Sequence, residues 1–250
     1  MESHSEMHST SHGERKTVIA GCVANVLEWY DFALYGYLAS VLAKLFFPTD
    51  DELSSLVLTF EVFAAGYLMR PLGAAILGNL GDKIGRKKVL IISVSLMAAS
   101  TTIIGLLPTY AQVGIVAPIL LTLLRLIQGF SVGGEFTGTI SFIVEHSQPS
   151  RRGFTGSFAT FSLIGGILLG SAIGALITSK LTAEEVTNWG WRIPFLFGIV
   201  VGGVGIYLRF GIEETPVFKS LQDKGEVGRA PILEALSNYR REILITMGTT

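Results

Sequence analysis

The sequence predicts an all-α membrane protein built from six transmembrane helices, followed by the start of a seventh. Two observations carry this prediction: the composition of the chain and the spacing of its apolar stretches. Of the 250 residues, 49% are hydrophobic and only 16% are charged, and the mean hydropathy is +0.53. Ordinary soluble domains contain about 25% charged residues, so this chain is too apolar for that class.

Six apolar stretches predict where the helices lie. Each approaches or exceeds the roughly 20 residues that a helix needs to cross a bilayer. Strands are excluded as spanning units, because open sheet edges leave backbone groups unsatisfied in lipid and the stretches show no alternation of polar and apolar residues. The predicted spans are residues 18–43, 53–80, 89–107, 113–144, 154–178 and 193–210.

The rest of the chain flanks this unit. Residues 1–14 are polar and lack the features of a secretory signal, so we expect a disordered cytoplasmic tail. Residues 15–211 form the six-helix bundle, and residues 212–241 form a charged cytoplasmic linker, for which an amphipathic helix on the membrane surface is the alternative. Residues 242–250 turn apolar again, which predicts the start of a seventh transmembrane helix.

The positions of the cations predict the orientation. If six spans alternate, fourteen of the nineteen Lys and Arg residues fall on one side of the membrane. The opposite loops hold only Lys44, Lys180 and Arg192, beside several carboxylates. Because positively charged loops stay in the cytoplasm, the N-terminus and the linker are predicted to be cytoplasmic.

Several function classes find no support in the sequence. No basic block suggests a nucleic-acid partner. Cys22 is the only cysteine, and the four histidines fall outside the predicted spans, so a membrane-embedded redox protein or metalloenzyme has few ligands to use. We therefore expect no cofactor, no metal site and no enzymatic activity.

Polar and ionisable side chains in the first two spans are functional candidates. An ionisable group at bilayer depth is costly, so it must face protein or water. Glu28 and Asp31 share one face of the first span, and Asn25 lies on the same stripe. Glu61 and Arg70 in the second span are about half a turn out of phase, so each needs a partner on another helix.

The fourth span carries a polar stripe that we expect to line a cavity. It consists of Arg125, Gln128 and Glu135. A structural ion pair would explain one or two of the charges within the first four spans, but six exceed what packing requires. Glu28 and Asp31 are therefore candidate proton carriers, and Arg125 is the candidate countercharge. Glycines in the fourth and fifth spans, including Gly129, Gly133, Gly166, Gly170 and Gly174, predict close helix packing.

Residues 78–88 form a short basic connection between the second and third spans. Gly78 and Gly81 lie on roughly one face, where missing side chains allow another helix to approach. Asp82 can hold the turn through ion pairs, or accept hydrogen bonds from backbone N–H groups at the N-terminus of a facing helix.

The pattern Gly-x-x-x-Asp-Lys-x-Gly-Arg-Lys at residues 78–87 resembles the loop between the second and third helices of the major facilitator superfamily. An ordinary positively charged turn needs neither the Asp nor the three glycines. Within that superfamily, five further motifs resemble those of metabolite:proton symporters, most closely the proline/glycine betaine branch. They occupy residues 25–32, 70–73, 125–135, 189–195 and 213–216.

This resemblance implies that the chain is the N-terminal half of a multi-pass inner (plasma) membrane carrier. Such a carrier moves a small charged or zwitterionic solute together with protons, and proline or glycine betaine is the best candidate. Alternatives are an organic-acid symporter, for citrate, α-ketoglutarate or shikimate, and a truncated, non-transporting scaffold. The second six-helix half is missing from the sequence. The resemblance also assigns a cytoplasmic gate to Gly78, Asp82, Lys83, Gly85, Arg86 and Lys87.

Overall fold

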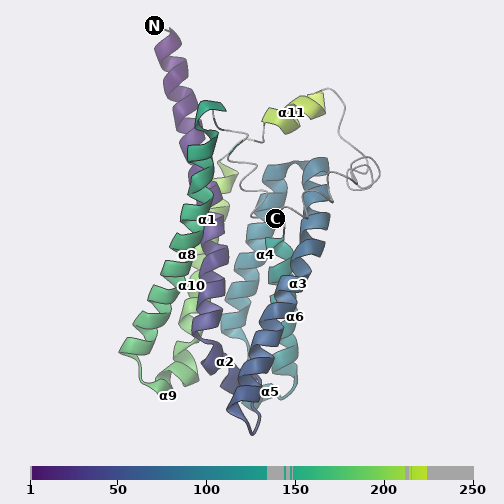
Figure 1. The fold of residues 1–250 in the computed structure, drawn as a ribbon, viewed down its shortest axis with the longest axis vertical. Coiled ribbons are helices and arrows are strands. Elements are labelled where there is room, and N and C mark those ends of the chain that lie inside the picture. The colour runs from purple at the N-terminus through teal and green to yellow at the C-terminus, as the bar shows by residue number, and fades with distance from the viewer. Residues whose placement is uncertain are drawn as a thin grey trace.

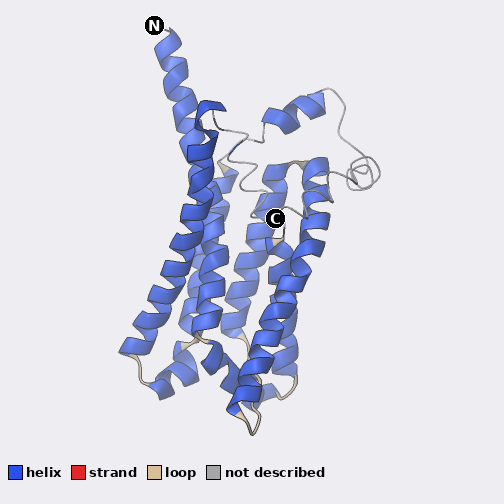
Figure 2. Ribbon diagram, in the orientation of Figure 1, coloured by secondary structure: helices blue, strands red, loops and turns tan. Residues whose placement is uncertain are grey.

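The computed structural model describes residues 2–133, 144, 147, 149–211, 214 and 216–223. Within these ranges the chain is helical, with short connections and no strand (Figure 2). The predicted all-α fold is therefore confirmed. Four of the described helices, α3 (Glu52–Ile84), α4 (Arg86–Leu106), α8 (Arg152–Lys180) and α10 (Arg192–Phe210), are long and apolar enough to cross a membrane.

The remaining elements complete the other predicted spans and the connections. They are α1 (Glu2–Tyr37), α2 (Ala39–Phe46), α5 (Tyr110–Val113), α6 (Val116–Val132), the 3-10 turn η1 (Pro149–Arg151), α9 (Ala183–Glu185), the π turn η2 (Val186–Gly190) and α11 (Pro216–Asp223). The long helices stand side by side as a bundle (Figure 1).

The N-terminal region differs from the prediction in two ways. Helix α1 already begins at Glu2, where a disordered tail was expected, and its first turns project beyond the bundle (Figure 1). Once a long helix has formed, each added residue gains a hydrogen bond without a new nucleation cost. The predicted span 18–43 is also interrupted at Leu38, where α1 ends and α2 begins, shortly after the poor helix former Gly36.

The fourth predicted span, 113–144, is also interrupted near its start. Gly114 has a φ of +59°, a conformation that glycine adopts without a steric cost, and it separates the short α5 from α6. Helix α6 ends at Val132, and residues 134–143, which include the candidate Glu135, lie outside the described residues.

The basic connection is much tighter than predicted. Almost all of residues 78–88 are helical, and a single residue, Gly85, separates α3 from α4. Its φ of +102° reverses the chain in a way that a residue with a side chain would resist. The prediction that another helix approaches closely at Gly78 is wrong within the described part of the chain. A Cβ added there would meet no atom within 4 Å.

Glycines of α8 allow this helix to pack closely on α1. A Cβ added at Gly166 would lie 2.6 Å from the carbonyl oxygen of Val26. A Cβ added at Gly170 would lie at the same distance from the carbonyl oxygen of Tyr30. Both distances are too short for a real side chain, so the prediction of close packing by these glycines is confirmed.

A second close contact joins α3 to α6. A Cβ at Gly129 would overlap the backbone carbonyl oxygen of Gly66. In the other direction, a Cβ at Gly73 would overlap the carbonyl oxygen of Phe130. The backbones of α3 and α6 therefore touch, which fixes the height of side chains on α6 relative to those on α3.

The two ends of the bundle differ in charge. One end holds the start of α1, the Gly85 turn and α11, and we call it the basic end because residues 83–88 add four cations there (Figure 1). The opposite end holds α2, α5 and α9 (Figure 1). Within the predicted linker 212–241 the structure describes Glu214 and α11; residues 224–250, including the predicted start of a seventh helix, lie outside the described part.

Large apolar side chains cover much of the outside of the bundle. Leu68 is 80% exposed, Phe161 is 72% exposed and Tyr207 is 78% exposed. In water such a surface would be a strong aggregation site, whereas lipid tails match it. The protein is therefore a multi-pass membrane protein whose outer surface is apolar and whose interior contains buried charges.

Candidate functional site

The centre of the bundle holds a sealed ion pair. Arg125 of α6 donates through Nη1 to Oδ2 of Asp31 of α1 at 2.6 Å. The side chains of Asp31 and Arg125 are 0% and 2% exposed. The structure thus brings together two residues that are 94 positions apart in the sequence and that the periodicity of α1 and α6 singled out separately.

Two neutral side chains complete the coordination of Asp31. Gln128 donates through Nε2 to Asp31 Oδ1 at 3.0 Å and to the hydroxyl of Thr101 at 2.8 Å. The Thr101 hydroxyl in turn donates to the same Asp31 oxygen at 3.0 Å. Asp31 therefore accepts one charge-assisted and two neutral hydrogen bonds, which suits the ionised carboxylate.

Thr101 and Tyr35 also belong to this site, and neither could be predicted from its position in the sequence. Thr101 is one of two adjacent threonines in α4, and only the fold shows which of them faces Asp31. Tyr35 lies one turn after Asp31 on α1, and the Arg125 guanidinium carbon is 3.8 Å from the centre of its ring. The Tyr35 hydroxyl donates to the carbonyl of Thr59 at 2.9 Å, which holds the ring in place.

A second ion pair lies one turn earlier on α1 and is partly open. Arg70 of α3 donates through Nη2 to Oε1 of Glu28 at 3.2 Å. The Glu28 side chain is 2% exposed, whereas that of Arg70 is 23% exposed. The expectation that Arg70 finds its partner on another helix is therefore met. Phe32 and Tyr67 flank the Arg70 guanidinium.

Three other candidates are placed differently. Asn25 donates to the Ala159 carbonyl at 2.6 Å and to the Ser162 hydroxyl at 2.8 Å, so it joins α1 to α8 rather than lining a cavity. Glu61 is exposed, and it makes no hydrogen bond or ion pair with any described residue. Glu135, as noted above, is not among the residues that the structure describes.

Several buried polar atoms near the two pairs lack a partner among the described residues. They are Nε and Nη2 of Arg125, Oε1 of Gln128, Nε of Arg70 and the indole Nε1 of Trp29. A buried donor without an acceptor costs about 1–3 kcal/mol, and native proteins contain few of them. Three of these atoms belong to Arg125 and Gln128 at the Asp31 site, and the other two belong to Arg70 and Trp29.

At the basic end, a carboxylate caps the start of α4. Both oxygens of Glu214 accept from the backbone N–H of Lys87, at 3.1 and 3.3 Å. Lys87 also donates from Nζ to the Phe210 carbonyl at 3.0 Å, which ties the end of α10 to the start of α4. Asp82 was one predicted candidate for such a capping role, but it is exposed and has no such bond among the described residues.

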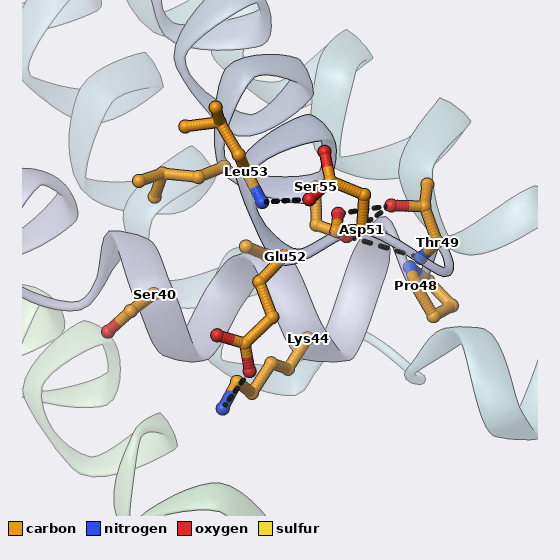
Figure 3. Close-up of a pocket in the computed structure, with 10 residues that line it drawn as sticks. Ser40, Lys44, Pro48, Thr49, Asp51, Glu52, Leu53 and Ser55 are labelled. Carbon is orange, nitrogen blue, oxygen red and sulfur yellow. Dashed lines mark hydrogen bonds and ion pairs between the residues drawn. The ribbon is translucent and has the colours of Figure 1, made fainter.

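The opposite end has an open cavity of about 780 Å³ between α2 and α3 (Figure 3). Its charged side chains pair with each other, as Lys44 contacts Glu52 at 3.2 Å (Figure 3). Asp51 accepts hydrogen bonds from the Ser54 side chain and backbone and from the Leu53 backbone, which lowers the pKa of its carboxyl group. These mutual contacts leave the cavity with few unsatisfied polar groups.

The structure holds ionisable groups at the centre of a bundle of membrane-length helices. This arrangement defines a class of protein, the multi-pass membrane proteins with charged groups in their interior. The chain belongs to the sugar (and other) transporter family, whose profile matches residues 17–240. This confirms the major facilitator superfamily predicted from the pattern at residues 78–87, and the family consists of transporters rather than enzymes.

Curated relatives are similar over most of this chain. A proline/betaine transporter of Salmonella typhimurium is 45% identical over 214 residues, which is 86% of this chain and 43% of the relative. A proline/betaine transporter of Escherichia coli K12 is 41% identical over 94% of this chain and 49% of the relative. A glycine betaine/proline/ectoine/pipecolic acid transporter of Dickeya dadantii is 43% identical over 85% of this chain and 42% of the relative. The chain thus spans about half the length of these relatives.

Solved structures show the same fold. The proton:xylose symporter XylE bound to 6-bromo-6-deoxy-D-glucose superposes with a TM-score of 0.77 at 21% identity, over 90% of this chain and 50% of that one. A partially occluded, inward-open form of XylE from E. coli gives a TM-score of 0.76 at 20% identity, over 94% and 58% of the two chains. At this identity the likeness concerns the fold alone.

Proposed function

We propose that this chain supplies half of a proton-coupled symporter for a small zwitterionic solute, of which proline and glycine betaine are the best candidates. The sealed Asp31–Arg125 pair is the observation that carries the proposal, because it places a titratable group and its countercharge inside the bundle. The names of the relatives support the choice of solute, since several are proline/betaine transporters.

The proton step follows from the contacts of Asp31. While Asp31 is ionised, Arg125 is held at 2.6 Å and its charge is balanced by that carboxylate. A proton that binds to an Asp31 oxygen neutralises the carboxylate and weakens its hold on Arg125. The guanidinium can then accept the carboxylate of a solute, and release of the proton on the other side restores the pair. Binding of the proton and binding of the solute are thereby linked.

The remaining partners and the orientation complete the proposal. Because the relatives are about twice as long, a second six-helix half would enclose the solute against α1, α3 and α6. The basic end would face the cytoplasm, with the N-terminus, and the protein would lie in the inner (plasma) membrane. Gly78, Asp82, Lys83, Gly85, Arg86 and Lys87 would act at the cytoplasmic gate, and nucleic acid is not an expected partner.

Uptake by proteoliposomes that contain the chain together with its second half tests this proposal. We expect labelled glycine betaine or proline to accumulate when an inward proton gradient is imposed, and a protonophore to abolish the accumulation. Accumulation of citrate or shikimate instead would point to the organic-acid alternative. If none of these solutes accumulated under either gradient direction, the symporter would be contradicted. The non-transporting scaffold would then be the remaining alternative.

A further inference from the structure

We propose that the aromatic rings between α1 and α3 form the subsite for the cationic head of the solute, and we call the rings of Trp29, Phe32, Phe63 and Tyr67 the aromatic cage. This inference rests on the proposed function, because it concerns how that solute is recognised. It assigns a binding role to four side chains outside the predicted polar stripes.

The rings of the cage pack against one another at angles, edge to face or tilted. The Phe32 centroid lies 5.4 Å from that of Phe63 and 5.3 Å from that of Tyr67, and the last two are 5.4 Å apart. Trp29 meets Phe32 edge to face at 5.7 Å. Trp29 and Phe32 come from α1, and the other two from α3, so the packing of these helices determines the shape of the cage.

The cage already holds a cation. The guanidinium carbon of Arg70 lies 4.0 Å from the centre of the Tyr67 ring and 4.6 Å from that of Phe32. Such distances are typical of cation–π contacts, in which the negative face of the ring attracts the charge. A quaternary ammonium has no N–H to donate, so aromatic faces are the groups that recognise it best. The geometry that accommodates Arg70 therefore suits such a head group.

Donors for the other end of a zwitterion lie beside the cage. The indole Nε1 of Trp29 and the Nε of Arg70 are buried, and neither has a hydrogen-bond partner in the described part of the chain. A carboxylate of the solute is an acceptor that these N–H groups lack. We therefore expect an exchange in which the ammonium takes the ring faces of Phe32 and Tyr67, while Arg70 turns toward the carboxylate.

The cage is reachable, unlike the Asp31 site. Tyr67 is 40% exposed and the Arg70 side chain is 23% exposed. A charged group at membrane depth does not face lipid, so the opening beside Arg70 must face water or the second half of the carrier. A solute can therefore meet the cage first and then approach Arg125, whose partner Asp31 lies one helical turn after Glu28 on α1.

Binding of two isosteric solutes to the complete carrier in detergent, measured by calorimetry, tests the cage. Glycine betaine carries a trimethylammonium group, and 3,3-dimethylbutanoate replaces its nitrogen by carbon and lacks the positive charge. Stepwise fluorination of the Phe32 ring removes π charge and leaves the fold nearly unchanged. We expect betaine binding to weaken with each fluorine, by about five- to tenfold over the series, and binding of the isostere to stay constant.

The matched control is the same fluorination at Phe161, which is 72% exposed on α8 and should have no effect. Betaine affinity that stays flat across the Phe32 series would overturn the cage, and so would an equal loss for both solutes, which would indicate shape rather than charge. A graded loss of binding in a protein that accumulates nothing in proteoliposomes would support the cage and contradict the symporter.

Discussion

Two ion pairs one helical turn apart on α1 differ in almost every respect. Asp31 and Arg125 are both buried and are 2.6 Å apart, and two neutral groups complete the carboxylate's hydrogen bonds. Glu28 and Arg70 are 3.2 Å apart, and the cation is partly open and lies on aromatic rings. Both pairs join α1 to a neighbouring helix, but only the first is closed to solvent on both sides.

This difference separates two tasks that a carrier must perform. A sealed pair keeps its charges away from solvent. Its two partners separate only when one of them is neutralised. A half-open pair exchanges partners more cheaply, because water or a solute can replace one of them. The closed pair suits coupling to protons, and the open pair suits the first contact with a solute.

The largest effect should come from breaking the closed pair. Asp31→Ala leaves Arg125 buried without its countercharge, so we expect a loss of about 3–5 kcal/mol in the free energy of unfolding, measured by denaturant titration in detergent micelles. The double variant Asp31→Ala with Arg125→Leu removes both charges and should be more stable than the single variant. A double variant less stable than the single one would contradict a buried charge as the cause.

A smaller effect should follow at the open pair. Arg70→Gln removes the cation beside the buried Glu28 carboxylate, but solvent reaches the site and screens the charge, so we expect a loss of about 1–2 kcal/mol. A double-mutant cycle with Glu28→Gln measures the coupling energy of the pair directly. If that coupling equalled or exceeded the coupling of Asp31 with Arg125, the proposed distinction between an open and a closed pair would fail.

The ring that covers Arg125 offers a finer test. Tyr35→Phe keeps the stacking on Arg125 and removes only the hydroxyl that donates to the Thr59 carbonyl. We expect a loss of about 0.5–1.5 kcal/mol in the same unfolding measurement. Tyr35→Leu should cost more because it also removes the π face. Equal losses for both variants would show that the ring contributes nothing to holding Arg125.

The exposed pair at the opposite end sets the lower limit of the comparison. Lys44 and Glu52 have side chains that are 62% and 86% exposed. Exposed pairs are screened by water and salt, so Lys44→Ala should leave the unfolding curve unchanged within error. A clear loss of stability would mean that the cavity between α2 and α3 contributes more to the fold than its mutually paired side chains suggest.

The spans of α3, α4, α8 and α10 could be predicted from the sequence to within about four residues, because bilayer thickness fixes how many apolar residues a helix needs. The early start of α1 and the breaks near Leu38 and Gly114 could not be predicted in this way. Periodicity also showed that Asp31 and Arg125 each lie on a polar stripe of its own helix. It could not show that the two stripes meet, nor that Asn25 turns toward α8, since the choice of neighbour depends on how glycines such as Gly129 and Gly166 let helices approach.

The turn between α3 and α4 shows a different limit. The residue pattern identified the superfamily, but it did not predict that Gly85 alone would form the connection or that Glu214, far away in sequence, would cap α4. A cap on α4 needs a carboxylate near the start of that helix. Asp82 and Glu214 both carry one, so the sequence does not distinguish them. Only the position of the end of α10 decides between them.

Proton-driven uptake by Asp31→Asn in the complete carrier tests the central claim most directly. Asparagine keeps the shape of the side chain but is always neutral. It can neither bind nor release a proton. We predict that the variant reaches the membrane, exchanges labelled for unlabelled solute across it, and no longer accumulates solute when a proton gradient is applied. Accumulation equal to that of the unaltered protein would contradict a coupling role for Asp31.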